Sequence, residues 1–228
     1  MNTDLEKIIA DGTKAPSGEN CQPWDFTVRD NIITIRNVPD RDTSLYNWEQ
    51  RGSFAAIGAA IENIVQMSGS LGYKSKIDLF PHSNDNNCVT NITLEGSGVR
   101  EENLSPYIEK RVTNRKPYSK KLLEVGVLGS IAHTTLNNIR VVSTRDQNSI
   151  RTLGQTASVN EEIMFQNKTL HEFFFSHINW DEQEDAEKRA GFYIKTLELP
   201  GPAKGLFKLI RHWPEMRAFN GIGLYKKI

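Results

Sequence analysis

The segment Ala-Pro-Ser-Gly-Glu-Asn-Cys-Gln-Pro-Trp-Asp-Phe, residues 15–26, constrains what this chain can fold into more than any other. Pro16 and Pro23 each fix their own φ and push the preceding residue towards extended geometry. Trp24 and Phe26 have the alternating spacing of a strand and can anchor its end in a core. The segment is therefore predicted to be a stiff polar loop that leads into a strand.

The side chains between the two prolines suit the recognition of a flat ligand with polar edges. Ser17, Asn20 and Gln22 supply a hydroxyl and two amides, and Gly18 allows a close approach of the backbone. The same residue types also make ordinary Asx and Ser turns between a helix and a strand. Residue chemistry alone leaves both interpretations open.

The pattern P-S-x-x-N-x-Q-P-W-x-F, which starts at Pro16, resembles the flavin-ring loop of the FMN-dependent nitroreductase family. Residues 52–64, followed by Leu-Gly-Tyr at 71–73, resemble the small-residue helix of that fold. Residues 111–118 resemble its R-x-T/S-x-R motif, which holds the flavin phosphate. The order of loop and arginine motif resembles the duplicated branch of the family, in which two half-related domains form an internal pseudo-dimer.

The resemblance implies an oxidoreductase in which NAD(P)H reduces FMN and the flavin reduces an electron-poor small molecule. It implies two groups of cofactor-binding residues: Pro16, Ser17, Asn20 and Gln22 over the ring, and Arg111, Thr113 and Arg115 at the phosphate. No residue is assigned as a general acid or base, because the flavin itself carries the chemistry. Two alternatives stay open: a flavin-sequestering or regulatory protein without turnover, and a structural remnant that binds no flavin alone and pairs with another chain.

The arginine motif has a physical rationale of its own. Arg111 and Arg115 with Thr113 between them can surround a phosphate dianion, whose oxygens arginine binds bidentately. Lys110 and Lys116 raise the local positive potential. The alternative is a solvated basic run at the end of a helix.

Hydrophobic spacing and turn residues predict the helices and strands. The resemblance implies that they form an α+β, nitroreductase-like fold, an antiparallel or mixed sheet with packed helices. The expected helices are 3–11, 50–71, 104–111, 120–135, 146–157 and 160–177, and the expected strands are 24–28, 32–36, 74–80, 88–94 and 139–143. Glycines inside the helix at 50–71 cost roughly 1 kcal/mol each relative to alanine, so close packing is expected to offset them. An acidic run at 181–187 is expected to be a solvated helix start.

Gly96-Ser97-Gly98 is the best boundary in the chain and predicts two nitroreductase-like halves, 1–98 and 99–228. The resembling family has a further small-residue helix and more strands beyond the point where this sequence stops. The second half is therefore expected to be incomplete. Either the chain is a fragment of a longer protein, which we favour, or its second half is naturally truncated. Its site would be completed by a homodimer or by an internal pseudo-dimer in a longer chain.

Composition excludes several classes of protein. The 28 basic and 28 acidic residues give a formal net charge of +0, which argues against a nucleic-acid or anionic-membrane binder. The two cysteines lack metal or redox spacing, and the five histidines are scattered, so no metal site is expected. No signal peptide and no run of about 18 apolar residues is present, so we expect a cytoplasmic protein.

Overall fold

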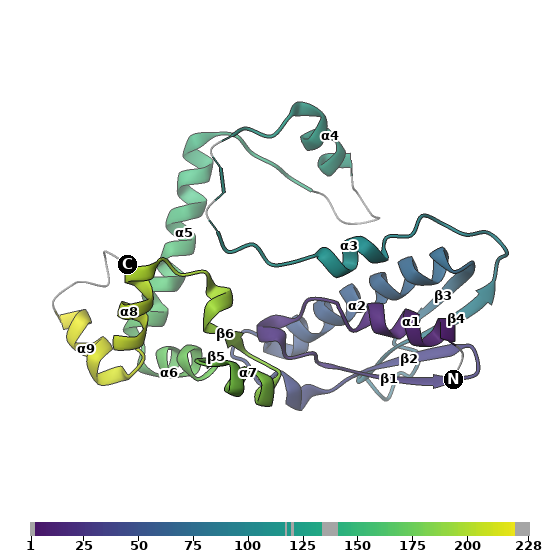
Figure 1. The fold of residues 1–228 in the computed structure, drawn as a ribbon, viewed down its shortest axis with the longest axis horizontal. Coiled ribbons are helices and arrows are strands. Elements are labelled where there is room, and N and C mark those ends of the chain that lie inside the picture. Colours follow the sequence, from purple (N-terminus) through teal and green to yellow (C-terminus); the bar gives the residue numbers. More distant parts are fainter. Residues whose placement is uncertain (1–2, 117, 120, 134–140, 222–228) are drawn as a thin grey trace. The chain divides into compact units, whose positions relative to one another are not determined.

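The computed structural model describes residues 3–116, 118–119, 121–133 and 141–221. The chain forms two compact units: residues 1–114 with 179–193, here called the first unit, and residues 115–178 with 194–228, the second unit. Helices and an antiparallel sheet together confirm the predicted α+β class (Figure 1). No helix among the described residues is long and apolar enough to cross a membrane.

The helices and strands of the first unit up to residue 114 agree with the prediction to within one or two residues at each end. They are α1 (Thr3–Gly12), β1 (Trp24–Arg29), β2 (Ile32–Asn37), α2 (Arg51–Ser70), β3 (Tyr73–Leu79), β4 (Cys88–Gly96) and α3 (Ser105–Lys110). Short 3₁₀ turns lie in the connections: η1 (Gly18–Asn20), η2 (Pro39–Arg41) and η3 (Trp48–Gln50).

The sheet of the first unit has the strand order β1-β2-β4-β3, and all neighbours are antiparallel. Ile33 pairs with Ile92, and both are fully buried in the core that α2 also lines. Ile77, the partner of Ile92 on the edge strand β3, is 43% exposed. Helices α1 and α2 pack on each other over one face of the sheet (Figure 1). The core includes buried side chains from both layers, among them Ile8, Trp24, Ile33, Ile35, Ile57, Ile64 and Ile92.

Glycine allows the close approach of α1 to α2. A Cβ on Gly12 would lie 2.8 Å from Cγ1 of Ile64, a distance that real Cβ contacts do not show. Gly58, inside α2, is different, because a Cβ there would meet nothing within 4 Å. The close packing expected to offset the glycines of α2 is therefore found at Gly52, where a Cβ would lie 3.2 Å from Asn47 Oδ1, and not around Gly58.

The second unit is helical and departs from the prediction at several places. Its elements are α4 (Val125–His133), α5 (Gln147–Gln166), α6 (Lys168–Ser176), η4 (Ile194–Leu197), α8 (Gly201–Leu209) and α9 (Trp213–Gly221). Helix α4 begins at Val125, so residues 121–124 of the predicted helix 120–135 are not helical. Residues 141–143 are not in a strand, and the rest of the predicted strand 139–143 lies outside the described residues.

The two helices predicted at 146–157 and 160–177 have their break in the wrong place. Helix α5 continues through Ser158 and Asn160 to Gln166, and the chain breaks at Asn167. The Asn167 side chain accepts a hydrogen bond from the backbone N–H of Leu170 at 3.1 Å and so caps α6. The cap at Asn167 therefore separates the two helices, and residues 158 and 159 lie inside α5.

A third group of elements lies between α6 and η4. A pair of two-residue strands, β5 (Ile178–Asn179) and β6 (Phe192–Tyr193), flanks α7 (Glu182–Lys188). The predicted acidic helix start is confirmed: Asp181 Oδ1 accepts from the N–H of Glu184 at 2.9 Å. Residues 179–193 belong to the first unit by their contacts. The predicted halves 1–98 and 99–228 were defined by their resemblance to nitroreductase domains, whereas the two units are defined by contacts within the chain. The two halves therefore stay a prediction.

Candidate functional site

The loop between α1 and β1 is closed by hydrogen bonds within itself. The Ser17 hydroxyl oxygen accepts from the backbone N–H of Gln22 at 3.0 Å, and the Cys21 N–H donates to the Gly18 carbonyl at 2.9 Å. These are bonds of the turn type that the sequence left open as an alternative. Pro16 and Asn20 are exposed, while Ser17 and Gln22 are half-buried. The four residues predicted to cover a flavin ring therefore lie together in one folded loop.

The loop backbone is strained. Glu19, Asn20 and Gln22 have φ values of 50°, 55° and 49°, although none of them is glycine. Positive φ in such residues is uncommon and costs free energy, and it clusters at functional sites. The surrounding structure must therefore hold this conformation.

Arg41, in the connection that follows β2, anchors the C-terminal end of this loop. Arg41 Nη1 donates to the carbonyl of Trp24 at 2.6 Å and lies 3.3 Å from the carbonyl of Gln22. The N–H of Val38 donates to the Pro23 carbonyl at 2.9 Å. Together these bonds anchor the loop where it enters β1.

The segment that contains α7 lies directly on the loop. The Gly191 N–H donates to the Glu19 carbonyl at 2.6 Å. Asn20 Nδ2 donates to the carbonyl of Arg189 at 3.3 Å, and Gln22 Nε2 donates to the same oxygen at 3.2 Å. Both amides predicted to face a flavin thus converge on one peptide carbonyl.

The thiol of Cys21, in this loop, is unreactive at neutral pH. Burial, and after it the nearby Asp42 carboxylate, raise the pKa of Cys21 to about 12. A thiolate is the nucleophilic form of cysteine. Cys21 is therefore no nucleophile at neutral pH, and covalent catalysis from the loop is not indicated.

The residues of the arginine motif do not all fall in one unit. Arg111 and Thr113 follow α3 in the first unit and are exposed. Arg115 belongs to the second unit, where its Nη1 lies 3.5 Å from the carbonyl of Thr196. The structure therefore brings the four loop residues together, but it does not bring Arg111, Thr113 and Arg115 together within one unit.

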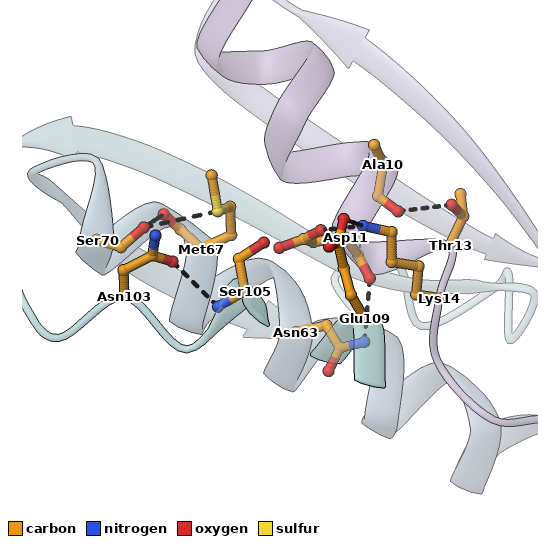
Figure 2. Close-up of polar contacts among 10 residues, drawn as sticks. All are labelled: Ala10, Asp11, Thr13, Lys14, Asn63, Met67, Ser70, Asn103, Ser105 and Glu109. Carbon is orange, nitrogen blue, oxygen red and sulfur yellow. Dashed lines mark hydrogen bonds and ion pairs between the residues drawn. The ribbon is translucent and has the colours of Figure 1, made fainter. Parts of the chain in front are cut away.

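An ion-pair chain links the start of the loop to the helix before the arginine motif. Lys14 Nζ lies 2.8 Å from Asp11 Oδ1 and 2.9 Å from Glu109 Oε1 (Figure 2). The hydrogen bond to Asp11, followed by that to Glu109, raises the pKa of Lys14. Asn63 Nδ2 donates to the Asp11 carbonyl at 3.0 Å and fixes this end of α1 on α2. Lys14 thus carries its charge at all physiological pH values.

Sequence reasoning missed Lys14, Arg189 and Gly191. Lys14 had a visible signal, because it directly precedes Ala15 and is spaced i,i+3 from Asp11 on a helix end. Arg189 and Gly191 had none, because they act through backbone atoms far along the chain. Among the described residues no group of three or more His, Cys, Asp or Glu side chains could hold a metal ion.

Comparison with known proteins gives distant relatives. No protein-family model matches the chain. Over 209 residues, or 90% of this chain, it is 24% identical to "Uncharacterized protein MT1398" of Mycobacterium tuberculosis and covers 29% of that protein. Over 117 residues, or 50% of this chain, it is 25% identical to "Putative NAD(P)H nitroreductase MT3217" of the same organism and covers 34% of it. The chain spans about a third of the length of the curated relatives it matches.

A solved structure gives only a loose match. It is named "Putative NADH dehydrogenase/NAD(P)H nitroreductase" from Bacteroides thetaiotaomicron and is 17% identical, with 50% of this chain and 84% of that chain covered and a TM-score of 0.36. The α+β class stated above therefore rests on the helices and sheet of this chain alone.

Proposed function

We propose that this chain contributes to an FMN-binding oxidoreductase of the nitroreductase type, which passes two electrons from NAD(P)H to an electron-poor small molecule. One observation carries the proposal: the side-chain amides of Asn20 and Gln22 converge on a single carbonyl oxygen, that of Arg189. The edge of an isoalloxazine ring offers carbonyl acceptors of the same chemistry. Distant similarity to a protein named as an NAD(P)H nitroreductase, over half of this chain, supports the same class.

The residues of the chain fit this cofactor in kind. The loop residues Pro16, Ser17, Asn20 and Gln22 would cover the ring, and Arg111, Thr113 and Arg115 would hold the phosphate. The guanidinium fork matches phosphate oxygens bidentately. A bound flavin supplies the two-electron chemistry, while the protein supplies binding, orientation and the exclusion of water.

The contact of Arg189 has a consequence for binding. Each side-chain amide has two N–H donors. Gln22 Nε2 donates to the carbonyls of Arg189 and Asn20, at 3.2 Å and 3.3 Å, so a flavin that accepts from it must replace one of these carbonyls. Asn20 Nδ2 donates to the Arg189 carbonyl alone among the described residues, which leaves it one further donor. Movement of the segment around Arg189 away from the loop would free one N–H on each of the two amides for the flavin.

The same contact favours a second candidate, a flavin-holding protein without turnover. A segment that returns over a bound ring would keep NAD(P)H and an acceptor away from it. In the resembling family the loop and the arginine motif come from two subunits or from two halves of one chain. We accordingly expect a homodimer or a longer pseudo-dimeric chain to complete the site.

The test is the visible absorption spectrum of the purified chain with and without added FMN. Arg111→Ala and Arg115→Ala should weaken flavin retention, whereas Arg29→Ala, at the exposed end of β1, is the charge-matched control. Bleaching of the bound flavin by NADPH or NADH identifies the oxidoreductase, and a bound flavin that does not bleach identifies the flavin-holding protein. If the FMN spectrum is unchanged by the wild-type chain, and also by a longer natural chain that contains it, both the oxidoreductase and the flavin-holding protein are refuted.

A further inference from the structure

A cavity of about 470 Å³ lies where the end of α1 approaches α3. It is lined by Lys14, Ile108, Glu109 and Arg111, and it opens to solvent. Its volume falls in the range of small-ligand sites, roughly 300–1,000 Å³. Figure 2 shows Lys14 between Asp11 of α1 and Glu109 of α3.

Both cations of the cavity have donors to spare. The Lys14 ammonium has three hydrogens, and its two partners among the described residues are Asp11 Oδ1 at 2.8 Å and Glu109 Oε1 at 2.9 Å. The Arg111 guanidinium has five N–H donors, and none of them has a hydrogen-bond partner among the residues that the structure describes. The cavity therefore offers a lysine and an arginine to an oxyanion.

The two carboxylates at Lys14 are not equivalent. The Asp11 side chain is 4% exposed and stays with Lys14, since removing its partner would leave a buried charge unpaired. The Glu109 side chain is 63% exposed, and exposed ion pairs contribute little. Glu109 is thus an oxyanion already held in the cavity, and one that a stronger oxyanion can displace.

We propose that Lys14 and Arg111 form a binding site for a phosphomonoester, in which the Glu109 carboxylate is an internal competitor that the phosphate displaces. A phosphate dianion carries more charge than a carboxylate and accepts charge-assisted hydrogen bonds from a lysine and an arginine at once. That the phosphomonoester is FMN rests on the proposed function, whereas the phosphate site itself does not. Asp11 acts as a positioning residue that fixes the Lys14 ammonium at the cavity.

The experiment titrates the chain with inorganic phosphate, followed by ³¹P NMR, and separately with FMN and riboflavin, followed by absorption and fluorescence. Lys14→Gln and Arg111→Gln should each weaken phosphate binding about tenfold, whereas Glu109→Gln should strengthen it several-fold. Lys7→Gln on the exposed side of α1 and Glu102→Gln, which is exposed and does not line the cavity, are the matched controls. Glu109→Gln keeps the Lys14–Asp11 pair intact, so it tests the site without the risk of unfolding.

The outcomes separate this inference from the proposed function. If the affinity for FMN changes across the variants in the same order as the affinity for inorganic phosphate, and the affinity for riboflavin does not, the phosphate site belongs to the flavin. If inorganic phosphate follows the series but neither flavin binds, the oxyanion site stands and the flavin proposal fails. If phosphate binds equally to all five variants and the wild type, or binds neither the wild type nor Glu109→Gln, the inference is overturned, and the FMN spectrum still decides the proposed function.

Discussion

At the scale of single residues, Cys21 lies among the candidate flavin contacts and yet is predicted to be unreactive. Its pKa of about 12, raised from the ordinary 9.0, leaves little thiolate at neutral pH. Alkylation by iodoacetamide at about pH 8 should be slower than for an ordinary thiol by roughly a thousandfold, since three pKa units separate them. Mass spectrometry of labelled peptides measures the rate. Asp42→Asn should accelerate labelling, and rapid labelling of the folded wild type would contradict the prediction.

His171 makes the stability of the second unit sensitive to acid. Its Nε2 lies 2.8 Å from the Ile210 carbonyl, which can only accept, so Nε2 carries a hydrogen. The ring packs on Phe175 and Trp213, with centroids 4.6 Å and 5.4 Å away, and Nδ1 is buried without a partner among the described residues. Burial lowers the pKa of His171 below its ordinary 6.5.

The sign of the pH effect follows from that shift. Below about pH 6.5 the unfolded chain binds a proton at His171 that the folded chain does not, so stability present above that pH is lost as the pH falls towards the folded pKa. The thermal midpoint should therefore drop between about pH 7.5 and pH 5. His171→Phe should reduce the drop, whereas His82→Gln, in an exposed loop, should leave it unchanged. An equal drop in the wild type and His171→Phe would exclude His171 as the cause.

At the scale of elements, the contact between α1 and α2 depends on one glycine. Gly12→Ala would place a methyl group 2.8 Å from Cγ1 of the fully buried Ile64, and overpacking of this kind costs about 1–3 kcal/mol. Gly58→Ala, where nothing lies within 4 Å, should instead be neutral or stabilise by up to about 1 kcal/mol. Urea unfolding of the two variants measures both values. Equal stabilities for the two would show that α1 is not packed as described.

At the scale of the whole molecule, the chain returns to its own N-terminal loop after passing through the second unit. The Gly191 N–H donates to the Glu19 carbonyl at 2.6 Å, and Gly191 has a φ of 92°. Proline has no N–H and a φ near −65°, so Gly191→Pro should release the segment from the loop. Trypsin cleavage after Lys188 and Arg189 should become several-fold faster, as measured by mass spectrometry. Glu187→Ala, exposed on α7, is the control, and unchanged cleavage in Gly191→Pro would mean that this bond does not hold the segment.

The sequence alone predicted the loop and the elements of the first unit up to residue 114, because these depend on local signals. Proline and glycine set the backbone between residues 12 and 23, and alternating apolar residues mark β1 and β2. The second unit was harder. The break at Asn167 was misplaced, since Ser158 and Asn160 are polar but tolerated in a helix, and only cap geometry distinguishes them.

Only the tertiary structure decided what the candidate site residues touch. Arg189 contacts Asn20 and Gln22 through a backbone carbonyl, and every residue type has one, so the sequence carries no signal for it. The link from Lys14 to Glu109 likewise depends on how α3 packs against α1 and α2. The loop's chemistry was readable because it lies in one short stretch. Its partners were not, because hydrogen bonds between distant segments depend on chain packing and not on spacing.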